Sequence, residues 1–174
     1  MSRHHNLQLP VQPLSVQLQN KERWNDRRAQ AAADFFTISY AGRDIQQLFT
    51  IVSEAGVCTV VDVRDTPVSM YRPEFSKSNL KRYLGERHIE YVHWPEWGVP
   101  RDIRALAVAT RTRDDIWRWY DANVVQRLYR NLDMFFNAVE HPVALLCVES
   151  DPTACHRHRL SLALEAKGLH SYDL

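Results

Sequence analysis

The segment Thr59–Arg64, TVVDVR, most clearly decides how the chain folds. It is apolar until its last residues, as is typical of a strand buried on both faces of a parallel sheet. Because side chains alternate along a strand, Asp62 and Arg64 share one face while Val61 and Val63 take the other. A buried acid and guanidinium need partners or a ligand. Mutual pairing of the two side chains and binding of a ligand are equal alternatives.

Further strands and helices alternate with this strand along the chain. We expect strands at 35–39, 90–94, 143–149 and 169–174, helices at 44–54, 77–87 and 155–167, and one or more helices within 101–140. Gly56 and Gly168 follow two of these helices, as is typical of helix C-termini. The alternation predicts an α/β fold, a compact three-layer α/β/α sandwich with a mostly parallel sheet of four or five strands.

The length and the first residues indicate the domain organisation. A chain of 174 residues has the length of one domain, or of one domain with an appendage. We expect a single α/β domain over 34–174. Residues 1–33 are rich in Gln, Asn, Arg and Pro and bury little apolar surface, which predicts a polar extension that is either flexible or docked on a protein partner.

Charge and cysteine content exclude several classes of protein. The 22 Lys and Arg side chains nearly balance 21 Asp and Glu, so a net charge of +1 gives no overall attraction to nucleic acid or membrane. Three cysteines are too few for a disulfide scaffold and suit a reducing compartment. The sequence shows neither a signal peptide nor an apolar run of about 18 residues. We therefore expect a cytoplasmic protein without a membrane partner.

The segment Cys147–Arg157, CVESDPTACHR, joins a predicted strand to a predicted helix. In parallel sheets ligands bind beyond the carboxyl ends of the strands, where this segment lies. His156 and Arg157 occupy the first helical turn and share its inner face with Leu160, so we expect both to project into the crevice. The start of the helix favours an anion and lowers the pKa of Cys155.

The same residue types raise the alternative of a metal site. Structural zinc sites usually contain Cys pairs separated by two to four residues, and this chain has none. Adjacent helical side chains diverge by about 100°, which argues against joint ligation by Cys155 and His156. We therefore expect no metal and no other cofactor; His93, Glu149 or His158 would be extra ligands if a metal did bind.

Interleaved basic and aromatic residues suggest nucleic-acid binding as a further alternative. They are Arg72, Lys77, Lys81, Arg82, Trp94, Trp97, Arg111, Arg113, Trp117, Arg118 and Trp119. The opposing interpretation, which we favour, is that the tryptophans cover the core and the arginines form an exposed helix face.

Four stretches together resemble one family: FTISYAGR (36–43), VVDVRDTPVSMYRPEFSKSNL (60–80), IEYVHWPEWG (89–98) and VALLCVESDPTACHRHRLSLAL (143–164). They look like the bacterial and archaeal family called domain of unknown function 488, over about residues 35–174. The resemblance implies a small three-layer α/β domain and no particular reaction. It implies functional positions at Tyr40, Arg43, Asp62, Arg64, Pro67, Phe75, Lys77, Cys147, Glu149, Cys155, His156 and Arg157.

This chain departs from the family pattern at two places. Ser39 stands where the family usually has Gly, and Trp97-Gly98-Val99 stands where a double Gly often follows the third strand. Bulkier side chains there are expected to narrow the crevice.

A weaker likeness connects the chain with rhodanese-type sulfurtransferases and Cys phosphatases. Those enzymes also have an Asp-Val-Arg strand end and a later strand that ends in Cys. Their nucleophilic Cys lies in a short loop that closes on an Arg and cradles an anion with backbone N–H groups. Here nine residues separate Cys147 from Arg157, and Pro152 removes one donor, so a close cradle is poorly supported.

The predicted function is binding of a small anionic ligand, such as a nucleotide or a nucleic-acid end, in a crevice at the carboxyl edge of the sheet, with catalysis by its polar side chains. The catalytic candidates are Cys155, His156, Glu149 and Asp62; the ligand-binding candidates are Arg64, Arg157, Tyr40, Arg43, Arg72, Lys77 and Cys147. Arg157 and Arg64 would hold the anion, while Cys155 would be a nucleophile or redox thiol. A non-enzymatic ligand sensor or interaction module and a rhodanese-like or phosphatase-like thiol enzyme are the alternatives.

Overall fold

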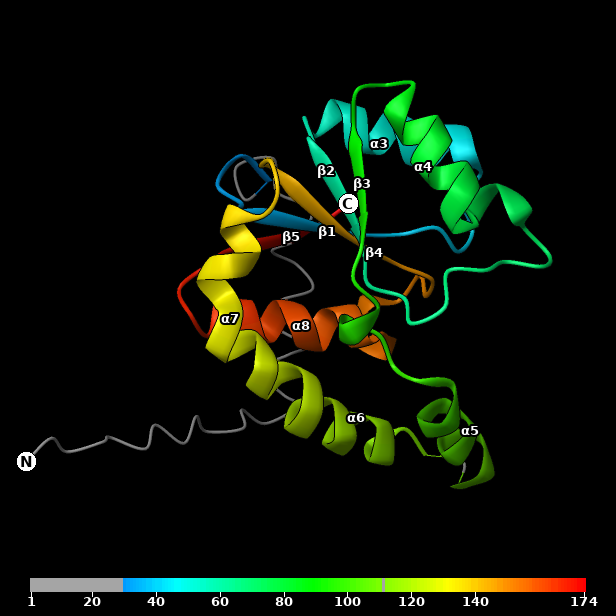
Figure 1. Ribbon diagram of the computed structural model, residues 1–174, viewed down its shortest axis with the longest axis vertical. Coiled ribbons are helices and arrows are strands. Elements are labelled where there is room, and N and C mark those ends of the chain that lie inside the picture. The colour runs from blue at the N-terminus through cyan, green and yellow to red at the C-terminus, as the bar shows by residue number, and fades with distance from the viewer. Residues whose placement is uncertain (1–29, 111) are drawn as a thin grey trace, which may run out of the picture.

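A five-stranded parallel sheet forms the centre of the computed structural model, which describes residues 30–110 and 112–174 (Figure 1). The strands are β1 (Phe35–Ser39), β2 (Thr59–Asp62), β3 (Glu90–His93), β4 (Val143–Cys147) and β5 (Ser171–Asp173), in the spatial order β3-β2-β4-β1-β5. All four pairings are parallel. The predicted α/β class and its strands are confirmed.

Helices cover both faces of this sheet (Figure 1). On one face lie α3 (Ile45–Glu54) and α4 (Lys77–Gly85). On the other lie α6 (Asp114–Tyr120), α7 (Gln126–Asn137) and α8 (His156–Glu165), while α5 (Arg101–Thr110) contacts α6 beside the sheet. The short helices are η2 (Pro73–Phe75), η3 (Pro95–Trp97), η5 (Pro152–Ala154) and a π-helical segment, η4 (Asp121–Val125).

Local sequence signals explain where α3 begins and ends. Asp44 caps the helix: its side chain accepts from the Gln47 N–H, and the Gln47 side chain accepts from the Asp44 N–H. Gly56 follows the helix with φ of 68°, a conformation that glycine adopts without strain. Between these signals, Leu48, Phe49 and Val52 form the buried stripe that packs on the sheet.

Three elements next to the predicted crevice are shorter than expected. β2 ends at Asp62, β4 ends at Cys147 and α8 begins at His156. The Arg64 N–H donates to the Asp62 carboxylate rather than to a neighbouring strand, so side-chain bonding ends the ladder there. Cys155 is the N-cap of α8 and has extended backbone angles, which excludes it from the helix.

Two expectations concern parts of the chain that are not described. The polar extension at 1–33 lies almost wholly outside the described residues, and so does Arg111. Within 30–110 and 112–174, no helix combines the length and the apolar character that crossing a membrane requires.

Candidate functional site

The strand order brings two polar strand ends together. β2 and β4 are neighbours, with Asp62 beside Leu146 in the parallel register. Beyond these positions the chain continues to Arg64 on one strand and to Glu149 on the other. Because side chains alternate across a sheet, Asp62 and Arg64 lie on the α3/α4 face, whereas Cys147 lies on the α8 face. The side chains at the two strand ends therefore begin on opposite faces of the sheet, although Arg64 and Cys147 both line one cavity beyond those ends.

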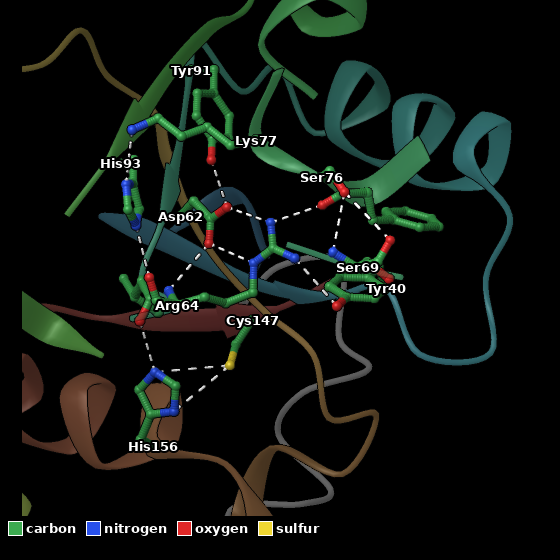
Figure 2. Close-up of polar contacts among 12 residues, drawn as sticks. Tyr40, Asp62, Arg64, Ser69, Ser76, Lys77, Tyr91, His93, Cys147 and His156 are labelled. Carbon is green, nitrogen blue, oxygen red and sulfur yellow. Dashed lines mark hydrogen bonds and ion pairs between the residues drawn. The ribbon is translucent and has the colours of Figure 1, made fainter. Parts of the chain in front are cut away.

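On the α3/α4 face, an ion pair is surrounded by hydrogen-bonding groups (Figure 2). The Arg64 Nε donates to Asp62 Oδ1 at 2.8 Å, and its two terminal nitrogens donate to the Tyr40 hydroxyl, the second Asp62 oxygen and the Phe75 carbonyl. The Tyr91 hydroxyl donates to Asp62 at 2.6 Å. We call Tyr40, Asp62, Arg64, Phe75 and Tyr91 the ion-pair network.

The ion-pair network satisfies its own charges. Asp62 is fully buried and Arg64 is 5% exposed, and each nitrogen of the guanidinium has a protein partner. Burial and the neighbouring Asp62 raise the pKa of Tyr91 well above its ordinary value, so the hydroxyl stays protonated. Of the alternatives that the sequence left open for Asp62 and Arg64, the geometry is that of mutual pairing.

On the α8 face, four reactive side chains gather at the end of β4. The Cys147 thiol donates to Glu149 Oε2 at 3.3 Å, and its sulfur lies 3.7 Å from His156 Nδ1. Figure 2 shows Cys147 and His156 facing one another below the ion-pair network. Cys155 joins them, since ligand atoms of Cys147, Cys155 and His156 all lie within 4.8 Å of one another. We call Cys147, Glu149, Cys155 and His156 the thiol cluster.

The two thiols of this cluster have opposite pKa shifts. Burial, a hydrogen bond to Cys155 and the nearby negative charges raise the pKa of Cys147 well above its ordinary value. Burial alone would also raise the pKa of Cys155, but the Cys147 thiol, His156 and Arg157 stabilise its thiolate and lower the pKa well below that value. Cys155 is thus the thiolate of the pair, stabilised by side-chain donors, although the sequence assigned the lowered pKa to the helix start.

The pKa values of the other two members of the thiol cluster, Glu149 and His156, also depend on the charge of Cys155. Burial and the charge of Cys155 raise the pKa of Glu149. For His156 burial acts in the opposite direction, but the hydrogen bond with Cys155 and its negative charge raise the pKa overall. A carboxyl and an imidazole beside a thiolate are groups that can donate and accept protons.

A cavity of about 460 Å³ opens onto the thiol cluster. Cys147, Glu149 and His156 line its buried end, and the exposed Arg104 and Arg113 line its solvent side. The remaining lining residues are Tyr40, Arg64, Asp65, Thr66, Val68, Val99, Ala107, Val108, Thr112, Ile116, Trp117, Val148 and Ala154. Its size and its mixture of apolar wall and converging polar groups are those of a small-molecule site.

Arg157 does not project into this cavity, contrary to the expectation from helical phase. Its side chain is fully buried, donates to the Glu149 carbonyl and pairs with Asp173 at 3.3 Å. Helical phase correctly placed it on the inner face of α8. The side chain runs along that face toward β5 instead of upward, because Asp173 at the sheet edge offers a partner for a buried charge.

Three other ligand-binding candidates make structural contacts outside the cavity lining. Arg43 donates to the carbonyls of Ser39 and Leu174 and so holds the C-terminal residue beside β1. Arg72 donates to the Tyr40 carbonyl and lies over the Phe75 ring. Lys77 lies 3.1 Å from His93 Nδ1, and the other nitrogen of His93 contacts the Arg64 carbonyl.

The loop between β4 and α8 bonds to itself rather than forming an anion cradle. Asp151 accepts from the N–H and the hydroxyl of Thr153, and the Ala154 N–H donates to the Asp151 carbonyl. The Cys155 N–H donates to the Pro152 carbonyl. Since these donors are used, the geometry gives no support to a phosphatase-like or rhodanese-like cradle. Asp151 is the N-cap of η5, and no side chain caps α8.

Some cavity residues were not identified from the sequence. Arg104 and Ala107 belong to α5, inside the stretch whose helix boundaries the sequence did not resolve. Trp117 was noted only as one of several aromatics. The other three tryptophans of the described residues pack on the core, as the interpretation against nucleic-acid binding expected: Trp97 is buried, while Trp94 and Trp119 pack against the same cluster. An arginine on a helix of uncertain limits carries no signal that it borders a cavity.

The two departures from the family pattern lie next to this cavity. Val99 lines it directly. Gly98 packs against the backbone of Asp65, since a Cβ atom added to it would lie 2.2 Å from the Asp65 nitrogen. Ser39 is buried, and its carbonyl accepts from Arg43. The expectation of a narrower crevice thus applies to Val99.

Comparison with known proteins gives one match. The model of the family described as Domain of unknown function DUF488 matches residues 44–164, from the N-cap of α3 into α8. The matched range contains both strand ends and all four members of the thiol cluster. Comparisons with curated proteins and with solved structures found no match.

Proposed function

The chain belongs to the family described as Domain of unknown function DUF488, and for this member we propose that the cavity binds a small anionic, nucleotide-like ligand and acts on it chemically. The observation that carries the proposal is the arrangement of one cavity with two arginines on its solvent side and the thiol cluster at its buried end. Arginine recognises phosphate and carboxylate groups, and the buried groups can move protons.

The solvent side of the cavity supplies the anion-binding groups. A guanidinium has five N–H donors. Arg113 uses one of them to donate to the Ala154 carbonyl, and Arg104 lies 3.9 Å from Asp65, beyond hydrogen-bonding distance. Both therefore keep donors for a phosphate group. Arg64, which the sequence assigned to the anion, is already paired with Asp62, so its charge is neutralised.

Between its solvent side and its buried end, the cavity has an apolar wall that contains an aromatic ring. Ile116, Trp117 and Val108 provide it from α5 and α6. A flat, weakly polar ring such as a nucleobase can stack or pack there while its phosphate remains near Arg104 and Arg113. The ligand would then extend toward Glu149 and His156.

A thermal-shift comparison tests binding. We expect nucleoside monophosphates to raise Tm, whereas the matching uncharged nucleosides do so much less. The double variant Arg104→Ala/Arg113→Ala should lose the shift. Arg101→Ala is the matched control, because Arg101 is also exposed on α5 but does not line the cavity. If no nucleotide shifts Tm, or if the double variant responds as the wild type does, the proposal is wrong.

A second measurement separates an enzyme from a sensor. A stabilising nucleotide is incubated with the protein and the mixture is analysed by chromatography and mass spectrometry. We expect a slow change in the nucleotide that His156→Ala and Glu149→Gln abolish while Arg101→Ala does not. Binding without any conversion would favour the alternative, a ligand-sensing module.

A further inference from the structure

The thiol cluster contains a group of side chains that are typical metal ligands. Sγ of Cys147, Sγ of Cys155 and a ring nitrogen of His156 all lie within 4.8 Å of one another, and both sulfurs are buried. One ligand comes from the end of β4 and two come from the start of α8. A strand of the sheet and a helix of its covering layer thus bring three ligand atoms near one another; Figure 2 shows two of them, on Cys147 and His156.

The conformation of Cys155 makes this convergence possible. Spacing within a helix argues that the adjacent Cys155 and His156 must diverge by about 100°. Cys155, however, has φ of −117° and ψ of 144°, so it is extended and precedes the helix. Its side chain does not follow the helical rotation, and the objection from sequence spacing does not apply.

The separation of the ligand atoms fits a tetrahedral ion. With zinc bonds of about 2.3 Å to sulfur and about 2.0 Å to nitrogen, tetrahedral angles place the two ligand atoms about 3.5 Å apart. Sγ of Cys147 and Nδ1 of His156 are 3.7 Å apart. The same sulfur also lies 3.8 Å from Nε2, so it is off the lone-pair axis of Nδ1, and an ion between the two ligands requires rotation of the imidazole ring.

The second nitrogen of His156 has the contact that orients metal-bound histidines. Nε2 lies 2.9 Å from the Val63 carbonyl, which can only accept, so Nε2 carries the proton. Nδ1 is then the nitrogen with a free lone pair, which a rotation of the ring would direct toward an ion beside Cys147. Metal-ligating histidines commonly donate their other N–H to a carbonyl or carboxylate in this way.

We propose that Cys147, Cys155 and His156 bind a zinc ion, with the fourth coordination position open to the cavity beside Glu149. Two thiolates and one imidazole are a ligand set that suits zinc. Cys147 and His156 line the cavity, as does Glu149, so a water molecule or an anionic group can reach the fourth position. Three protein ligands with one open position are typical of catalytic zinc sites.

The charges balance when the ion binds. One Zn²⁺ replaces two protons, one from the Cys147 thiol and one from the Cys155–His156 pair, and both are released to solvent, so the buried site gains no net charge. Of the three extra ligands named from the sequence, Glu149 lies beside the site. Within the described residues, His93 contacts Lys77 and the Arg64 carbonyl instead, and His158 does not belong to the group that converges with Cys147.

A disulfide between Cys147 and Cys155 is the competing explanation for two neighbouring sulfurs. It would need neither the imidazole nor the hydrogen bond that fixes its tautomer. The two explanations differ in one measurable respect, because a zinc site protects the thiols under reducing conditions whereas a redox pair leaves them reactive there.

The test uses the full chain, reduced with a phosphine and stripped with a chelator, without any nucleotide. We expect one equivalent of Zn²⁺ to bind, and Co²⁺ to give the near-ultraviolet charge-transfer band of a thiolate complex. Cys147→Ser, Cys155→Ser and His156→Gln should each weaken zinc binding about 100-fold or more. Cys58→Ser is the matched control, since Cys58 precedes β2, outside the thiol cluster.

A measurement on the wild-type chain tests the zinc site even if the substituted variants do not fold. Zn²⁺ should slow alkylation of Cys147 and Cys155 but leave Cys58 unaffected, as mass spectrometry of the labelled peptides would show. Addition of azide to the Co²⁺ form should change its visible spectrum, because azide enters an open position. An unchanged spectrum would exclude the open fourth position.

Three results would overturn the zinc site: no stoichiometric binding by the reduced chain, a charge-transfer band that survives in Cys147→Ser, or alkylation unaffected by Zn²⁺. Rapid formation of a Cys147–Cys155 disulfide in a chain that binds no zinc would favour the redox pair. All of these measurements are made without nucleotide, so their failure leaves the proposed ligand binding standing, and failure of nucleotide binding leaves the zinc site standing.

Discussion

The ion-pair network and the thiol cluster lie at the carboxyl ends of the neighbouring strands β2 and β4, on opposite faces of the sheet. They differ in how their polar atoms are hydrogen-bonded. In the network, every guanidinium nitrogen of Arg64 has a partner and Asp62 is fully buried. In the thiol cluster, the Cys147 sulfur has contacts of 3.3 to 3.8 Å with Glu149 and His156, and these three side chains line the cavity together with Tyr40 and Arg64 of the network. A buried charge that is fully paired indicates a structural role, whereas thiols, a carboxyl and an imidazole with shifted pKa values beside a cavity indicate chemistry.

The largest expected effect is on the ion-pair network. Asp62→Ala leaves the Arg64 guanidinium buried without its counter-charge, and breaking a buried pair in this way costs about 3 to 5 kcal/mol of unfolding free energy. Urea denaturation followed by circular dichroism measures the change. Glu86→Ala removes the exposed pair with Arg82 and should leave the urea midpoint nearly unchanged. Equal effects of the two substitutions would contradict the structural role of the network.

An intermediate effect is expected at Arg157, which lies on the α8 face and is paired with Asp173, while its buried Nε has no hydrogen-bond partner. Arg157→Met keeps most of the apolar volume and removes the bonds to the Glu149 carbonyl and Asp173. We expect a loss of about 1.5 to 3 kcal/mol, as for buried hydrogen bonds to a charged group. The same urea experiment measures it. If stability were unchanged while nucleotide binding disappeared, the interpretation from sequence, in which Arg157 holds the anion, would be correct.

The smallest expected effect is on the thiol cluster. In chelator-treated protein, Cys147→Ala removes one buried atom whose polar contacts are weak, so we expect a cost of about 1 kcal/mol. The urea midpoint is compared with that of Cys58→Ala. A loss above about 3 kcal/mol would show that the cluster stabilises the fold as strongly as the network does, and the contrast between the two faces would fail.

The sequence predicted the elements of the fold well because their signals are local. The apolar runs of β2 and β4, the cap at Asp44 and the stops at Gly56 and Gly168 act through neighbouring residues alone. The predicted ends of β2 and α8 differ from the observed ends by one or two residues. At Arg64 the backbone N–H donates to a side chain instead of a strand, and at Cys155 the backbone is extended instead of helical. The α5 and α6 boundaries were missed because no single strong signal separates these helices.

The candidate site was predicted only in part. The sequence identified all four members of the thiol cluster and both charges of the ion-pair network, since reactive residue types at strand ends are visible in the sequence. It placed the Arg157 side chain in the crevice and gave no separate role to Arg104. Helical phase gives the face of a side chain but not its direction along that face, which depends on where its partner lies.

By itself the sequence determined that the chain forms an α/β sandwich, which strands are buried, and that Asp62 and Arg64 share a face, because periods of two and of 3.6 residues are properties of the local backbone. Only the tertiary structure decided that β2 lies beside β4, that the sheet divides the ion-pair network from the thiol cluster, and that α5 and α6 close the cavity. Strand order and the choice of partner for each buried charge depend on contacts between residues far apart in sequence, and no local pattern records them.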